Sequence, residues 1–131
     1  MEIALDTNAY SDWIRRGLWQ DVISGASRVW LPSVVIGELY RGFYSGNRAG
    51  ENEALLREVL DQPEVGVLSI GLNEALVYGE LLHYLRGQGT PLPVNDIWIA
   101  AACVEHGCTL VTSDKHFEQL PQVRLAKRNG E

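Results

Sequence analysis

Apolar residues follow two alternating patterns along the chain, and these predict a regular succession of strands and helices. Short uninterrupted apolar runs, typical of strands buried on both faces of a parallel sheet, occur at residues 3–5 and 29–31, and residues 65–68 and 108–112 are predicted to be two further strands. Between these runs, apolar residues recur at the three- and four-residue spacing of amphipathic helices. We therefore expect an α/β fold, a three-layer α/β/α sandwich around a parallel sheet.

The expected helices follow from the same spacing and from Ser, Asn and Gly residues that can begin or end a helix. Ser33 can cap the helix that follows the second strand, and residues 123–126 are expected to add a last edge strand. The helices expected are two short ones within 9–24 separated at Gly17, then 33–43, 51–60, 73–87, 95–107 and a short one containing Phe117 and Leu120.

Length and composition are those of one globular domain spanning residues 1–131, with 46% hydrophobic and 21% charged residues. No apolar run approaches the roughly 20 residues of a membrane helix, and the N-terminus lacks the pattern of a signal peptide. We expect a cytoplasmic protein with no membrane contact. Cys103 and Cys108 are interpreted as buried thiols, because their spacing to His106 and His116 matches no zinc pattern.

Four acidic residues occupy related positions in this predicted fold. Asp6 and Asp114 follow strands at their carboxyl ends, Glu38 lies in the helix after the second strand, and Asp96 begins a later helix. Because functional clefts of open α/β sheets lie at the carboxyl edge, all four can converge there. Asp6 taken alone could equally be the cap of the next helix.

A cluster of carboxylates needs cations, because like charges held close together cannot all remain ionised without a counter-ion. Oxygen ligands favour Mg²⁺ or Mn²⁺ over zinc. Cations held by carboxylates can activate water and stabilise the leaving oxygen in phosphodiester hydrolysis. The net charge of −6 argues against nucleic acid at first sight, but bound cations would offset most of it.

Four sequence blocks resemble the motifs of PIN-domain ribonucleases. The blocks are LDTN at residues 5–8, SVVIGEL at 33–39, NDIWIAA at 95–101 and LVTSDKHF at 110–117. Within that family the chain is most similar to the VapC-type toxins of toxin–antitoxin pairs. The resemblance extends from Ile3 to about Ala126. It implies an α/β/α sandwich, Mg²⁺ or Mn²⁺ dependence, endonucleolytic cleavage of RNA, homodimers and neutralisation by a small cognate antitoxin protein.

The resemblance also implies a role for each residue that matches a family motif. It makes Asp6 and Asp96 metal ligands, Asp114 a ligand directly or through water, and Glu38 a ligand or a water-orienting base. The residues expected to support these ligands by hydrogen bonds are Asn8, Thr112 and Ser113.

His116 departs from the family pattern, because many PIN domains carry an additional acid at this position. The departure places a full second metal site in doubt. His116 could contact the scissile phosphate or simply cover the core. Arg41, three residues after Glu38, could pair with that acid or reach toward an RNA phosphate, and the sequence leaves both possibilities open.

The four tryptophans could stack on RNA bases, but packing explains two of them equally well. Trp30 lies in a predicted buried strand and Trp98 on the helix of Asp96. We interpret Trp13 and Trp19, on the first helices, as an exposed apolar patch where a partner would dock.

Three other functions are compatible with parts of the pattern. An aspartyl-phosphate phosphatase would need a second acid two residues after Asp6, where this chain has Asn8, and its phosphate-binding lysine could only be Lys115. A non-catalytic RNA-binding PIN module is disfavoured because all four acids are present. An RNA-processing nuclease without an antitoxin remains compatible with every motif.

Overall fold

A computed structural model describes residues 1–126, so Lys127 and Arg128, which we expected to form a solvated tail, lie outside the described residues. The strands are β1 (Glu2–Leu5), β2 (Arg28–Pro32), β3 (Val65–Leu68) and β4 (Thr109–Val111). The helices are α1 (Thr7–Arg16), α2 (Gln20–Ser24), α3 (Ser33–Ser45), α4 (Ala49–Leu60), α5 (Leu72–Gln88), α6 (Val94–His106) and the short 3₁₀ helix η1 (Lys115–Gln119).

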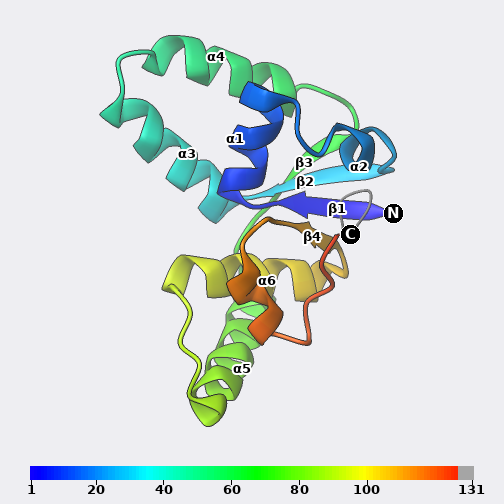
Figure 1. Cartoon of the computed structure of the whole chain (residues 1–131), viewed down its shortest axis with the longest axis vertical. Coiled ribbons are helices and arrows are strands. Elements are labelled where there is room, and N and C mark those ends of the chain that lie inside the picture. The colour runs from blue at the N-terminus through cyan, green and yellow to red at the C-terminus, as the bar shows by residue number, and fades with distance from the viewer. Residues whose placement is uncertain (127–131) are drawn as a thin grey trace.

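The four strands form one parallel sheet in the order β3-β2-β1-β4. Helices α1, α3 and α4 cover one face, and α5 and α6 cover the other (Figure 1). The predicted α/β/α sandwich with a parallel sheet is therefore confirmed. The strand order reverses beside β1, because the chain moves outward through β2 and β3 and then returns to place β4 on the other side of β1. In open α/β sheets such a reversal leaves a crevice at the carboxyl edge.

The core is formed by apolar residues of all three layers. Apart from the half-buried Trp30, the apolar side chains of β1, β2 and β4 are almost completely buried, which agrees with the apolar runs in the sequence. On the face of the sheet covered by α5 and α6, Ile97, Ala100 and Ala101 of α6 are almost completely buried and belong to this core. Phe117 of η1 is fully buried and anchors the segment that follows β4. The cysteines Cys103 and Cys108 are buried free thiols, as expected.

The structure corrects the prediction of an exposed patch at Trp13 and Trp19. Trp19 is only 4% exposed and belongs to the core, and its backbone adopts the left-handed conformation with φ 66°. Gly17 has a similar φ of 68°, so the link between α1 and α2 reverses tightly and turns Trp19 inward. Trp13 is half-buried, with its ring edge-on to Tyr10 and its Nε1 donating to Gln20.

Two local predictions are also wrong. Ser33 does not cap α3, because it is the first residue of the helix and Pro32 occupies the cap position without a side-chain bond. Residues 123–126 do not form a full strand. They contribute one isolated bridge, between Leu125 and Leu110 of β4, supported by two backbone hydrogen bonds to Leu110.

Two of the tryptophans contact neighbouring side chains in a way that supports packing. Trp98 of α6 stacks on Tyr78 of α5, with ring centroids 3.9 Å apart. Trp30 of β2 is half-buried, donates from Nε1 to Glu2 and carries the Arg28 guanidinium over its ring. Among the described residues no helix is long and apolar enough to cross a membrane.

Candidate functional site

Asp6, directly after β1, is held by hydrogen bonds from two segments, α1 and the residues that follow β4. Its Oδ1 accepts from the backbone N of Ala9 at 2.8 Å and caps α1, while its Oδ2 accepts from Thr112 Oγ1 just beyond β4. Thr112 Oγ1 in turn accepts from the backbone N of Asp114 at 3.0 Å. Asp6 is therefore a helix cap and also part of the acidic cluster, so the two roles considered from sequence are compatible.

The Asp6 carboxyl is only 6% exposed. Burial raises its pKa, and the nearby carboxylates of Asp96 and Asp114 raise it further, although the bonds from Thr112 and Ala9 work in the opposite direction. An ionised Asp6 is thus destabilised by its surroundings. A bound cation would relieve this penalty.

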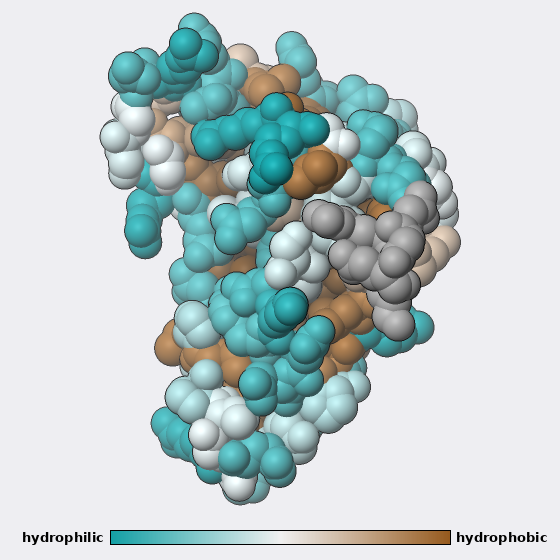
Figure 2. Space-filling view, in the orientation of Figure 1, coloured by the Kyte–Doolittle hydropathy of each residue, from teal (hydrophilic) through white to brown (hydrophobic). Residues whose placement is uncertain are grey.

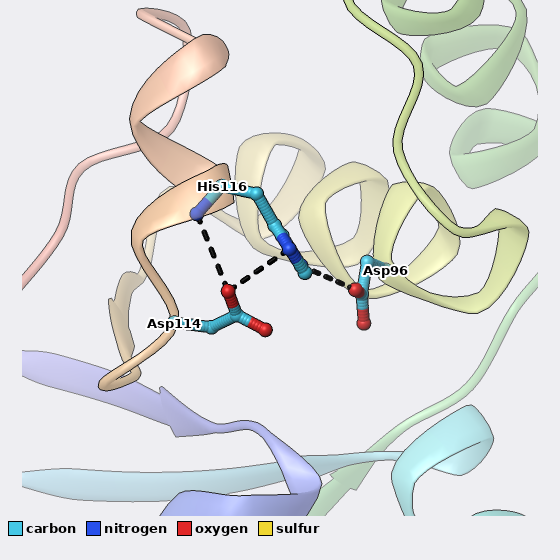
Figure 3. A group of neighbouring side chains, drawn as sticks. All are labelled: Asp96, Asp114 and His116. Carbon is cyan, nitrogen blue, oxygen red and sulfur yellow. Dashed lines mark hydrogen bonds and ion pairs between the residues drawn. The ribbon is translucent and has the colours of Figure 1, made fainter.

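Asp96, Asp114 and His116 form a compact group on the other side of the site (Figure 3). Asp96 lies in the first turn of α6, and Asp114 caps η1 by accepting from the backbone N of His116 at 3.3 Å. The His116 ring lies between the two acids, with Nε2 2.6 Å from Asp96 Oδ2 and Nδ1 2.9 Å from Asp114 Oδ1. One potential ligand atom from each of these residues lies within 4.8 Å of the other two.

Asp96 shows the same electrostatic pattern as Asp6. Burial raises its pKa, and the charges of Asp114 and Glu38 raise it further, while its contact with His116 lowers it. Asp6 and Asp96 are therefore both influenced by Asp114, which shows that acids from distant parts of the sequence share one electrostatic environment.

Glu38 lies in the second turn of α3, where it is half-buried. Thr7 Oγ1 donates to its Oε1 at 2.5 Å, and Asn95 Nδ2 donates to its Oε2 at 3.3 Å. Sequence reasoning missed both partners. The available signal was their position, because Thr7 follows Asp6 and Asn95 precedes Asp96. Arg41 is exposed, and no hydrogen bond or ion pair joins it to Glu38 in the described residues.

Asn8 and Ser113 lie at the rim of the site and are exposed. Together with Asp12, Asp114 and Lys115 they line an open hollow of about 450 Å³ beside the acidic cluster. The face of the molecule drawn in Figure 2 is largely hydrophilic, with apolar patches between the polar groups. Of the three expected supporting residues, Thr112 makes hydrogen bonds to the cluster, whereas for Asn8 and Ser113 a supporting role stays a prediction.

The donor set suits a hard divalent cation. Asp96, Asp114 and His116 bring potential ligand atoms within 4.8 Å of one another, and charge effects on pKa link Asp6 and Glu38 to this group. Among the described residues no lysine or arginine forms an ion pair with these four acids. Carboxylate oxygens are the preferred ligands of Mg²⁺ and Mn²⁺. The residues expected to hold a metal therefore fit one.

Comparisons with known proteins agree with this fold. Residues 3–123 match the model of the PIN domain family. The chain is 32% identical over 99 residues to ribonuclease VapC4 of Mycobacterium tuberculosis, covering 73% of this chain and 75% of the relative. It is 26% identical over 106 residues to ribonuclease VapC2 of Rickettsia felis, covering 80% and 78%.

Solved structures share the whole architecture. VapBC-1 from nontypeable Haemophilus influenzae matches with a TM-score of 0.86 at 22% identity, covering 97% of this chain and 98% of that one. VapBC-5 from Mycobacterium tuberculosis, a member of the VapBC family of toxin-antitoxin systems, matches with a TM-score of 0.78 at 25% identity, covering 97% and 98%. With four acids gathered at the carboxyl edge of a PIN-like sheet, this chain belongs to the PIN-domain family and, within it, to the VapC ribonucleases.

Proposed function

We propose that this VapC-type ribonuclease cleaves RNA internally by metal-assisted hydrolysis at the cluster of Asp6, Glu38, Asp96 and Asp114. The observation that carries the proposal is the convergence of these acids, from four separate elements, on one half-buried edge of the sheet. Asp6, Asp96 and Asp114 would hold the ion, with Mg²⁺ or Mn²⁺ favoured by the oxygen ligands. The ion, once bound, would supply charge stabilisation at the phosphate and lower the pKa of a bound water.

The protein side chains have distinct tasks in this mechanism. Thr112 and the backbone of Ala9 fix both oxygens of Asp6, so that the carboxylate is preorganised for a ligand. Thr7 and Asn95 fix the Glu38 carboxylate, which keeps further lone pairs free to accept a proton from the attacking water. The hollow bounded by Asn8, Ser113 and Lys115 would admit the RNA backbone to the cluster.

Cleavage of a structured RNA tests the metal-dependent mechanism. Purified protein should cleave with Mn²⁺ or Mg²⁺, and EDTA or the substitution Asp6→Asn should abolish cleavage, while Asp61→Asn, a change at an exposed acid outside the cluster, should leave it intact. Cleavage that survives both chelation and Asp6→Asn would refute the mechanism.

We further propose that the chain acts as the toxin of a toxin–antitoxin pair and assembles as a homodimer with a small antitoxin. Support comes from structural neighbours such as the VapBC complexes of Haemophilus influenzae and of Salmonella typhimurium, the latter bound to DNA. Induced expression should arrest growth, and co-expression of the cognate antitoxin should restore it. The variant Asp6→Asn is the matched control, because it should be produced equally well and be harmless.

Normal growth during strong induction of soluble, cleavage-competent protein would instead favour an RNA-processing nuclease that works without an antitoxin. A folded protein that binds RNA but cleaves none under any metal condition would favour the non-catalytic PIN module. The hydrodynamic mass of the purified chain, measured with and without antitoxin, tests the homodimer.

A further inference from the structure

His116 occupies the space between two carboxylates where the family pattern often has another acid. Its ring joins Asp96 of α6 to Asp114 of the loop after β4, with one nitrogen turned to each (Figure 3). The segment is well anchored, because the backbone N of His116 donates to Asp114 and the neighbouring Phe117 is fully buried. The His116 side chain is 34% exposed, so it can be reached from solvent.

The two nitrogens of the His116 ring contact different carboxylates, Nδ1 that of Asp114 and Nε2 that of Asp96. A neutral imidazole carries one N–H, and the 2.9 Å contact of Nδ1 with Asp114 Oδ1 suits an N–H that donates to a carboxylate. Nε2 faces Asp96 Oδ2 at 2.6 Å, a hydrogen-bond distance in the metal-free protein. A cation must lie between these two atoms; it is a shared proton in the metal-free protein and can be a metal ion when one is bound.

A metal ion can replace that proton, because Asp96, Asp114 and His116 each offer a potential ligand atom and these atoms lie within 4.8 Å of one another. Two neighbouring ligands of an octahedral ion at about 2.1 Å lie roughly 3 Å apart, so Nε2 and Asp96 Oδ2, now 2.6 Å apart, need only a small separation to share an ion. A ligating histidine commonly donates its other N–H to a carboxylate, which fixes the tautomer and the ring orientation, and Asp114 is placed to accept that bond.

We propose that His116 is itself a metal ligand through Nε2, that it shares the ion with Asp96, and that Asp114 orients the ring. The inference rests on the proposed metal-dependent function, since it names a ligand of the same site. An imidazole ligand also changes which metal ions the site is expected to prefer. Imidazole nitrogen is a softer ligand than carboxylate oxygen, so the site should prefer Mn²⁺ and later transition ions to Mg²⁺ more strongly than an all-oxygen site would.

Pulsed electron paramagnetic resonance of the full chain loaded with Mn²⁺ alone tests the inference directly, because it detects a ¹⁴N nucleus bound to the ion. The wild type should show ¹⁴N coupling from one imidazole. His116→Gln should lose it, and His83→Gln should keep it, because His83 is an exposed histidine of α5 far from the cluster in sequence. Wild-type protein with bound Mn²⁺ and no ¹⁴N coupling would overturn the proposal.

Calorimetric titration with Mn²⁺ and with Mg²⁺ supplies the second readout. His116→Gln should weaken Mn²⁺ binding about tenfold to a hundredfold and Mg²⁺ binding much less. His116→Asp, which restores a charged ligand, should keep Mn²⁺ binding without ¹⁴N coupling and shift the preference toward Mg²⁺. Equal losses for both ions in His116→Gln, with no recovery in His116→Asp, would mean that the ring is structural and would overturn the proposal.

The two proposals fail in different ways. Mn²⁺-dependent cleavage without ¹⁴N coupling would leave the ribonuclease mechanism standing and remove His116 as a ligand. ¹⁴N coupling without any metal-dependent cleavage would confirm the ligand and remove the mechanism. Folded protein that binds no Mn²⁺ at all would overturn both. If His116→Gln fails to fold by circular dichroism, the comparison of wild type with His116→Asp still decides the ligand.

Discussion

Thr7 Oγ1 donates a hydrogen bond to Oε1 of Glu38 at 2.5 Å, and this contact joins the first residue of α1 to α3 across 31 positions of sequence. The contact ties Glu38 to α1, the helix that Asp6 caps. Asn95, next to Asp96, donates to the other oxygen of the same carboxylate. Glu38 is therefore held from two sides by residues that adjoin the expected metal ligands.

Removing the hydroxyl of Thr7 should lower activity without unfolding the protein. Thr7→Val keeps the side-chain volume but removes the donor to Glu38, so the carboxylate loses its orientation, and we expect kcat to fall about tenfold to a hundredfold. Thr7→Ser, which keeps the hydroxyl, is the matched control and should remain near wild type. Equal activity of Thr7→Val and wild type, measured with saturating Mn²⁺, would show that this bond does not position Glu38.

Glu38→Gln tests the role of the acid itself. Removing one of the negative charges that act on Asp96 should stabilise the metal-free protein by on the order of 1 kcal/mol, while lowering the cleavage rate and the affinity for Mn²⁺. The three quantities are measured by thermal unfolding in EDTA, by RNA cleavage and by calorimetric titration. If none of the three quantities changes, Glu38 is not part of the site, which would then consist of Asp6, Asp96 and Asp114.

The stability of the metal-free protein should depend on pH through Asp6 and Asp96. Burial raises the pKa of both acids in the folded state, so folding takes up protons, and the cost of ionising them is absent below the ordinary carboxyl pKa of 3.8. The cost grows as the pH rises through the raised pKa values and then stays constant.

Asp6→Asn should remove its share of this cost and still accept the capping bond from Ala9. Urea unfolding in EDTA should therefore show Asp6→Asn to be more stable than wild type at pH 7.5, with the difference shrinking toward pH 4. A difference that is constant across this range would argue against a buried, charge-coupled Asp6.

Gly66 of β3 should be required for stability, because the Trp30 ring leaves no room for a side chain at this position. A Cβ at Gly66 would lie 2.5 Å from Trp30 Cζ3, and this ring is held by its bond to Glu2 and by the Arg28 guanidinium above it. We expect Gly66→Ala to destabilise the fold by about 1–3 kcal/mol, with little effect on cleavage per folded molecule.

Gly42→Ala is the control for this prediction. A Cβ at Gly42, inside α3, meets no atom within 4 Å, so the substitution should stabilise the fold by about 0.5–1 kcal/mol. Denaturant unfolding of both variants measures the difference. A Gly66→Ala protein as stable as Gly42→Ala would mean that the Trp30 ring moves freely.

The sequence by itself determined the features that depend on local pattern. Uninterrupted apolar runs mark strands buried on both faces, and helical spacing marks the layers that cover them, so the α/β/α sandwich follows from residue order alone. The same pattern places Asp6, Asp96 and Asp114 at the carboxyl ends of strands or the first turn of a helix. These acids could be named because secondary structure and strand direction already bring them to one edge of the sheet.

Tertiary structure alone decided how those elements contact one another. The bonds from Thr7 and Asn95 to Glu38 join residues 31 and 57 positions apart, and no periodic pattern encodes such a pairing. Trp19 was expected at the surface, but a left-handed turn after α1 reverses its side chain into the core. The placement of His116 between Asp96 and Asp114 likewise depends on how η1 docks against α6. Such contacts depend on how segments that are distant in sequence pack against one another. Many residues of the core together determine that packing, so no local pattern predicts it.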